Sequence, residues 1–253
     1  MQATGTHDVL RILDGIIADC KAKSDPLGYF PALYRQVTLT VQQGIAQGSF
    51  DNGPRMDRFD ALFANRYFAA YSAFRSGVQP AKSWQVAFQG TQSGQLIILQ
   101  DLLVGINAHI NLDLGVVTGE TFPGPALAGF HDDFDKINAI LSGLLPKVEA
   151  VVGEFSPLLG ILSRLGGKDA IEVLDFSMDA ARDDAWLHAE LLSVQPPSVW
   201  PLTVKALDAK VAFLGRIVAE PTGLVERAVD LIRETESRDV PAIIDALNGI
   251  VPA

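Results

Sequence analysis

Apolar residues recur three and four positions apart along most of this chain, and no other feature constrains its fold as much. Prolines stand near the starts of these apolar segments and glycines just after their ends, which is typical of α-helices. Alternating strand patterns and hairpin signals are scarce. The spacing therefore predicts an all-α protein.

The same pattern of prolines and glycines predicts roughly ten helices. A central helix is expected at about 92–117, because its residues are suited to contact neighbours over most of its circumference. The other helices are expected at 7–23, 25–48, a segment ending near 77, 127–141, 168–193, 201–219, 222–235 and 239–247, with shorter segments around Trp84, after Pro146 and after Pro157. No linker longer than a few residues separates them, so we expect one helical domain that spans 1–253.

Composition narrows the classes of partner. Hydrophobic residues make up 48% of the 253 residues, which is enough for a large core. The net charge is −10 and the basic residues are scattered, so no nucleic-acid partner is expected. The single cysteine, Cys20, fits a reducing compartment, and we find no secretory signal and no uninterrupted apolar run of membrane-spanning length. We therefore expect a cytoplasmic protein without a membrane span, and nothing in the sequence indicates its oligomeric state.

The segment 105–114, GINAHINLDL, places charged groups where a core helix should be apolar. On a helical wheel, His109 and Asp113 fall in the middle of the apolar arc, beside Ile106, while Asn107 falls on the far side. Side chains four residues apart on a helix can touch. We therefore expect His109 and Asp113 to form a pair inside the protein.

Two arginines occupy similar positions on other helices. Arg182 lies in the middle of an apolar face with Asp175 and Trp186 beside it, and Arg66 lies among aromatic residues. An unpaired buried charge is strongly destabilising, so these groups must meet one another or a ligand. The expected interior cluster consists of His109, Asp113, Arg66 and Arg182, together with Asp175, Asn107 and Asn138.

Three segments resemble an uncharacterised bacterial family of all-helical proteins, a domain of unknown function. They are GINAHINLDL at 105–114, HDDFDKINAIL at 131–141 and ARDDAW at 181–186. The resemblance covers roughly 57–192, and the residues outside that range have no counterpart in it. It implies a helical fold and a family role for His109, Asp113 and Arg182, without implying an activity.

The expected cluster favours acid/base chemistry on a small, largely apolar substrate held between helices. His109 would transfer the proton, Asp113 would orient it, and Arg182 or Arg66 would hold an anionic or carbonyl oxygen. The residues expected to bind the substrate are Phe63, Tyr67, Trp84, Asn107, Asn138, Asp175 and Trp186. Such a site suits cyclisation, dehydration, isomerisation or hydrolysis, as in the cyclases and lyases of secondary metabolism, and it needs no cofactor.

Three other interpretations stay open. His109 and Asp113 have the spacing of two metal ligands, and a third from His131, Asp133 or His188 would make a metal-dependent hydrolase. The HExxH motif and paired Glu-x-x-His motifs are absent, so no metal is expected. The same pocket would serve a protein that binds an apolar ligand without transforming it. A cluster without any cavity would be a purely structural network.

Overall fold

The computed structural model describes residues 1–164 and 178–250. Within these ranges the chain forms helices and no strands, which confirms the expected all-α class. The α-helices are α1 (Thr6–Ala22), α2 (Tyr29–Ala46), α3 (Gly53–Arg75), α4 (Lys82–Ser93), α5 (Ile98–Ile106), α6 (Gly115–Thr121), α7 (His131–Phe155), α8 (Gly160–Arg164), α10 (Met178–Ser193), α11 (Trp200–Ala219), α12 (Gly223–Thr235) and α13 (Val240–Asn248).

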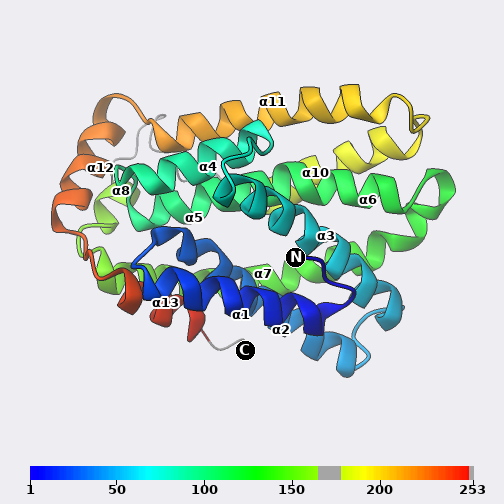
Figure 1. Ribbon diagram of the computed structural model, residues 1–253, viewed down its shortest axis with the longest axis horizontal. Helices are drawn as coiled ribbons and strands as arrows, with labels where there is room; N and C mark the ends of the chain where they lie inside the picture. The colour runs from blue at the N-terminus through cyan, green and yellow to red at the C-terminus, as the bar shows by residue number, and fades with distance from the viewer. Residues whose placement is uncertain (165–177, 251–253) are drawn as a thin grey trace.

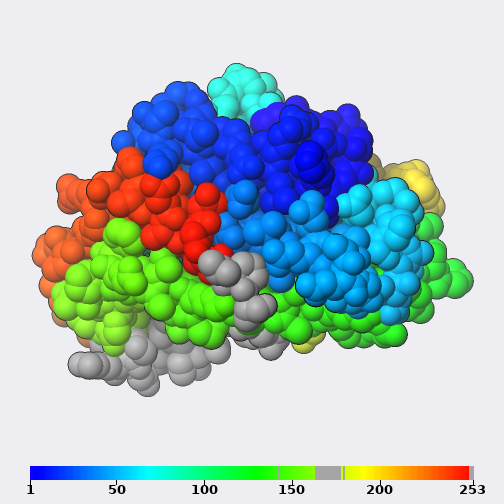
Figure 2. Space-filling view, turned by 90° about the horizontal axis from the view of Figure 1, so that it is seen from below, coloured from blue at the N-terminus to red at the C-terminus, as the bar shows by residue number. Residues whose placement is uncertain are grey.

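The helices pack as a bundle around α5 and α6. Figure 1 shows these two helices along the middle of the molecule, with α4 and α11 on one side and α1, α2 and α13 on the other. Helix α10 packs against α6, and α7 packs against both α2 and α10. Figure 2 shows that the first helices, α7 and α13 share one face, so segments far apart in the sequence close the bundle together.

The central helix is continuous from Ile98 to Thr121 and contains a π-helical segment, η2 (Asn107–Leu114), between α5 and α6. It begins later than the expected residue 92, because α4 extends to that point and ends at Gly94. The φ of Gly94 is +66°, a left-handed conformation that favours glycine and ends the helix. Trp84 therefore belongs to a full helix, not to a short segment as the sequence predicted.

Length and composition would also allow the central helix to cross a membrane. It is the candidate found among the described residues, with 24 residues and a mean hydropathy of 1.3 in its most apolar window. However, 89% of that window is buried inside the protein. The core helix of a bundle passes the same test, so these two properties do not assign the helix to a membrane.

Helix α7 continues through Pro146, where the sequence predicted a new segment. Pro146 is exposed, whereas Leu144 and Val148 on either side of it are buried. The apolar face therefore continues past the proline, and the proline ring lies on the solvent side, where the loss of one backbone hydrogen bond is tolerated. The helix expected at 168–193 is described from Met178 onward as α10, and its first part lies outside the described residues.

Glycines allow α6 and α10 to pack closely. A Cβ atom added to Gly115 would lie 2.7 Å from the carbonyl oxygen of Ala185, and one added to Gly119 would lie 2.8 Å from that of Ala189. No side chain fits at such distances, so the two helix backbones are in direct contact. This contact positions α10, the helix that carries Arg182.

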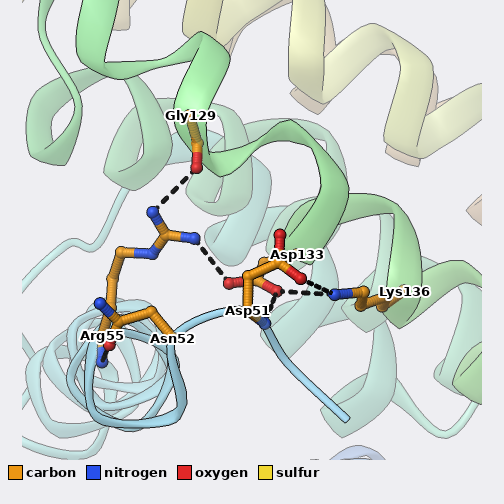
Figure 3. A network of polar contacts seen from close by, with 6 residues as sticks. All are labelled: Asp51, Asn52, Arg55, Gly129, Asp133 and Lys136. Carbon is orange, nitrogen blue, oxygen red and sulfur yellow. Dashed lines mark hydrogen bonds and ion pairs between the residues drawn. The ribbon is translucent and has the colours of Figure 1, made fainter.

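A polar network joins the loop between α2 and α3 to the start of α7 (Figure 3). The carboxylate of Asp133 is fully buried and accepts hydrogen bonds from the backbone N–H of Asp51 at 2.7 Å and from Arg55 at 2.6 Å. Lys136 donates to both aspartates, and Arg55 also donates to the carbonyl oxygen of Gly129 at 2.8 Å. Although burial alone would raise the pKa of Asp133, these partners lower it. The network therefore holds an ionised carboxylate inside the protein.

Candidate functional site

The segment that carries His109 is π-helical. A π-helix joins residues five apart, is rare, and often occurs at functional sites. On one side of this segment, Asn107 donates to the carbonyl oxygen of Val211 at 3.0 Å and accepts from Asn111 at 2.9 Å. The backbone oxygen of Asn111 lies 3.0 Å from Nδ1 of His188. These contacts with α10 and α11 hold the wide turn, and His109 and Asp113 belong to a separate set of contacts.

The carboxylate of Asp113 has three partners. Its Oδ1 accepts from Nε of Arg66 at 2.9 Å, and its Oδ2 accepts from Nε1 of Trp84 at 2.8 Å. The same Oδ2 lies 3.4 Å from Nδ1 of His109, so the expected pair is present. Burial alone would raise the pKa of Asp113, but the charge of Arg66 and the hydrogen bonds outweigh it and lower the pKa. Asp113 is therefore ionised and faces His109.

Aromatic rings surround the imidazole of His109. The ring of Phe63 is parallel to it at a centroid distance of 3.7 Å, and the ring of Tyr34 lies across it at 4.6 Å. Phe30, Trp84 and Tyr67 complete the cage at 5.6, 6.0 and 6.2 Å. Within this cage, Asp113 is the charged neighbour that the ring contacts.

The cage keeps His109 neutral. Burial lowers its pKa below the ordinary 6.5, although Asp113 partly offsets this. With Nδ1 facing a carboxylate, the proton of the neutral ring belongs on Nδ1, and Nε2 carries the lone pair. Nε2 is buried and has no hydrogen-bond partner among the described residues. His109 therefore presents an unused proton acceptor.

His109 lines an apolar cavity of about 90 Å³. Helices α2, α3, α7 and α10 and the central helix supply its walls, which consist of Phe30, Leu33, Tyr34, Val37, Phe63, Ile106, His109, Ile110, Ile137, Leu141, Leu144, Leu145, Val148, Met178 and Arg182. The polar side chains in this wall are Tyr34, His109 and Arg182. A cavity of this size and lining suits a small apolar molecule with few polar groups.

Arg182 reaches the same cavity from α10. Its side chain is only 2% exposed, its guanidinium lies over the ring of Phe134 at 4.2 Å, and it donates to the carbonyl oxygen of Phe134. Both His109 and Arg182 line this cavity, which agrees with the expectation that they share an interior site. Arg66, in contrast, is 28% exposed and contacts Asp113, so it acts on His109 through the carboxylate.

The remaining predicted residues are distributed around this centre. Phe63 lines the cavity, and Tyr67 and Trp84 belong to the aromatic cage. Asn107 does not join the cluster, because its amide is bonded to α11 on another side of the helix. Trp186 packs on Phe134 at 4.9 Å and is not part of the cavity wall.

Two further predicted residues do not enter the site as described. Asn138 lies on α7, and its buried side-chain oxygen has no hydrogen-bond partner among the described residues, but Asn138 is not part of the cavity wall. Asp175 lies outside the described residues. The cluster therefore consists of His109, Asp113 and Arg66, with Arg182 in the wall of the adjoining cavity.

The candidate third metal ligands lie in other environments. His131 is half exposed and pairs with Asp135, and Asp133 is bonded to Arg55. His188 faces Asp184 and Lys210. In the part of the chain that the structure describes, no three His, Cys, Asp or Glu side chains are grouped to hold a metal ion.

Sequence reasoning missed three important residues. Phe30 and Tyr34 form part of the cage, and Asp60 lies in a small chamber beside the cavity. A signal for Asp60 existed, because Met56 and Phe63 place it on an apolar helix face, as the neighbouring aromatic residues did for Arg66. For Phe30 and Tyr34, an aromatic pair on an apolar face looks like ordinary core.

These features define the class of the protein: an all-helical bundle whose central π-helical segment brings a buried His–Asp pair to an apolar cavity. The chain belongs to a family of unknown function (DUF5995), whose model matches residues 6–221. The match is wider than the resemblance at 57–192 and includes α1, α2 and α11. No curated protein and no solved structure matched the chain.

Proposed function

We propose that this protein is an enzyme that moves a proton on a small, largely apolar substrate, with His109 as the general base. The observation that carries the proposal is the unpartnered Nε2 of a neutral, buried histidine whose Nδ1 faces a carboxylate and whose ring lines a cavity. A histidine in a purely structural network would have partners at both ring nitrogens.

The chain's own residues supply each part of a proton transfer. Nε2 of His109 removes a proton from the substrate and becomes N–H, and the ring becomes positively charged. Asp113 stabilises that charge and holds the ring in the productive orientation, while Arg66 holds Asp113. Arg182 faces the negative charge that develops on the substrate. The proton then returns from Nε2 to another atom of the substrate, so no external reactant is needed.

Isomerisation and dehydration fit this chemistry better than hydrolysis does. The cavity is small and lined mainly by apolar side chains, so it favours a reaction within one apolar molecule over one that must also admit and position a water molecule. The substrate is expected to have an acidic C–H group next to a polar oxygen.

Deuterium exchange tests the proposal without knowledge of the natural substrate. Small cyclic ketones in D2O would be incubated with the protein, and loss of the α-proton signals would be followed by NMR. We expect exchange above the buffer rate with the wild type. His109→Asn, whose amide can still donate toward Asp113 but has no group at the Nε2 position, should abolish it. Exchange at an equal rate with His109→Asn would overturn the proposal.

The same experiment separates an enzyme from a binding protein. If a ketone binds to the wild type with the affinity it shows for His109→Asn, and neither protein exchanges its protons, the cavity binds ligands without transforming them. The control is Asp101→Asn, at a buried carboxyl that is not part of the cavity wall.

A further inference from the structure

A second, smaller chamber adjoins the His109 cavity. Its volume is about 30 Å³, and it lies between α2, α3, α7, α10 and the central helix. The two spaces share five wall residues, which are Tyr34, Val37, Phe63, Ile137 and Arg182. A ligand in the larger cavity can therefore place a small group in this side chamber.

Asp60 is the acidic group of the side chamber. It projects from α3, its side chain is only 5% exposed, and its Oδ2 has no hydrogen-bond partner among the described residues. The hydroxyl of Tyr34, in the wall of both spaces, is also buried, and the side chain of Thr38 is its polar neighbour. Buried polar atoms are rarely left unsatisfied, and those that are require an explanation such as a ligand.

The surroundings of Asp60 favour a neutral carboxyl. Burial, with a smaller contribution from the charge of Asp57 on the same helix, raises its pKa to about 7. The other charged or titratable side chains in the chamber wall are Tyr34 from α2 and Arg182 from α10, whereas α7 and the central helix contribute apolar groups. A neutral carboxyl donates a hydrogen bond, which an ionised one does not.

We propose that the side chamber binds a carbonyl oxygen of the substrate, with Asp60 and Arg182 as its hydrogen-bond donors. The inference rests on the proposed function and names the substrate class as a small, largely apolar ketone or related carbonyl compound. Its apolar body occupies the larger cavity beside His109.

The proposed reaction only moves a proton and electron pairs within one substrate molecule. His109 removes the proton from the carbon next to the carbonyl group, and the C–H electron pair forms a C=C bond while the C=O π electrons move to the oxygen. Asp60 and Arg182 stabilise the resulting enolate through hydrogen bonds, since donors placed where charge develops lower the barrier. Return of the proton from His109 to carbon regenerates a ketone. No oxidant, reductant or other reactant takes part.

Two probes of matched shape test the role of Asp60. Cyclopentanone carries the carbonyl oxygen, and methylenecyclopentane replaces that oxygen with CH2. Binding of each probe to the full chain would be measured by NMR titration. We expect Asp60→Leu to weaken cyclopentanone binding about tenfold, the size of one lost hydrogen bond, and to leave methylenecyclopentane binding unchanged. Asp101→Asn, at another buried carboxyl outside the chamber, is the matched control and should change neither affinity.

Asp60→Asn provides the second variant. Its amide keeps a donor that does not titrate, so cyclopentanone should bind to it at all pH values. Binding to the wild type should instead weaken as the pH rises through about 7, where Asp60 loses its proton.

Three results would overturn the inference: equal weakening of both probes by Asp60→Leu, no weakening of cyclopentanone, or no binding of cyclopentanone by the wild type. Ketone exchange that requires His109 but is unaffected by Asp60→Leu would leave the proposed function intact while removing Asp60 from it.

Discussion

Two buried aspartates in this protein are each bonded to an arginine, yet their surroundings differ. Both oxygens of Asp133 accept hydrogen bonds, and its partners are Arg55, Lys136 and the backbone of the α2–α3 loop (Figure 3). Asp113 is also bonded at both oxygens, but one of them faces His109. The other ring nitrogen of His109 has no partner in the part of the chain that the structure describes, and the ring lines a cavity. The first network is closed, and the second is open at one atom.

This contrast separates buried charges that hold the fold together from buried charges that can act on a ligand. A closed network holds two segments together and offers nothing to a ligand. An open network leaves a buried group with an unmet hydrogen bond, which destabilises the empty protein and is met when a ligand binds. Variants at the closed site should therefore change stability alone, whereas variants at the open site should change ligand chemistry as well.

The largest effect on stability is expected at the closed network. Asp133→Asn should lower the free energy of unfolding by about 3 kcal/mol, because it leaves Arg55 and Lys136 without their buried carboxylate. Urea denaturation measures this loss. The control is Asp135→Asn on the exposed side of the same helix, which should change stability little. Ketone affinity of the folded Asp133→Asn protein should equal that of the wild type, and a clear loss would refute the division into closed and open networks.

Replacing Asp60 should stabilise the protein at neutral pH, whereas replacing Asp133 destabilises it. Its folded pKa of about 7 lies above the ordinary 3.8, so its contribution to stability is complete below pH 3.8 and is lost as the pH rises toward 7. Asp60→Asn does not titrate. Relative to the wild type, its free energy of unfolding should therefore rise by about 2 kcal/mol between pH 5 and pH 7, measured by urea denaturation at each pH. Asp132→Asn, at an exposed position, should show no such gain.

Part of the site could be predicted because it follows from helix geometry alone. The spacing of four residues brought His109 to Asp113, and the position of Arg66 and Arg182 on apolar faces indicated that they point inward. Which helices face one another depends on tertiary packing. Asn107, on the far side of the same helix, was included in the cluster, although contacts with α11 hold it elsewhere.

The π-helical segment left no recognisable trace in the sequence. Its residues have the same apolar spacing as an α-helix, and the contacts that hold it come from distant segments, namely Val211 on α11 and His188 on α10. The sequence also failed to predict that α7 continues through Pro146, again because tertiary contacts decide the outcome. A proline inside a helical pattern usually ends the helix. Here the buried residues Leu144 and Val148 continue the core contacts on both sides of Pro146.

Asp113 connects stability to the chemistry of the open network. Asp113→Asn should lower the free energy of unfolding by about 1–2 kcal/mol, less than Asp133→Asn, because Asp113 is paired with one cationic side chain, Arg66, whereas Asp133 is paired with both Arg55 and Lys136. It should also lower the pKa of His109 further, since the carboxylate now raises it. NMR titration of the imidazole measures that pKa. Glu120→Gln, which removes only the weak 4.0 Å contact of Arg66, should leave the His109 pKa unchanged.

The smallest effect concerns the helix that brings Arg182 to the cavity. Gly115→Ala should destabilise the protein by about 1 kcal/mol, because the new methyl group meets the backbone oxygen of Ala185 and must push α10 away from the central helix. Gly143→Ala on α7 has open space around its Cβ and should instead stabilise slightly, as alanine favours helices. If α10 shifts as expected, cyclopentanone binding weakens in Gly115→Ala and not in Gly143→Ala. Unchanged binding in both would show that the position of Arg182 does not depend on this packing.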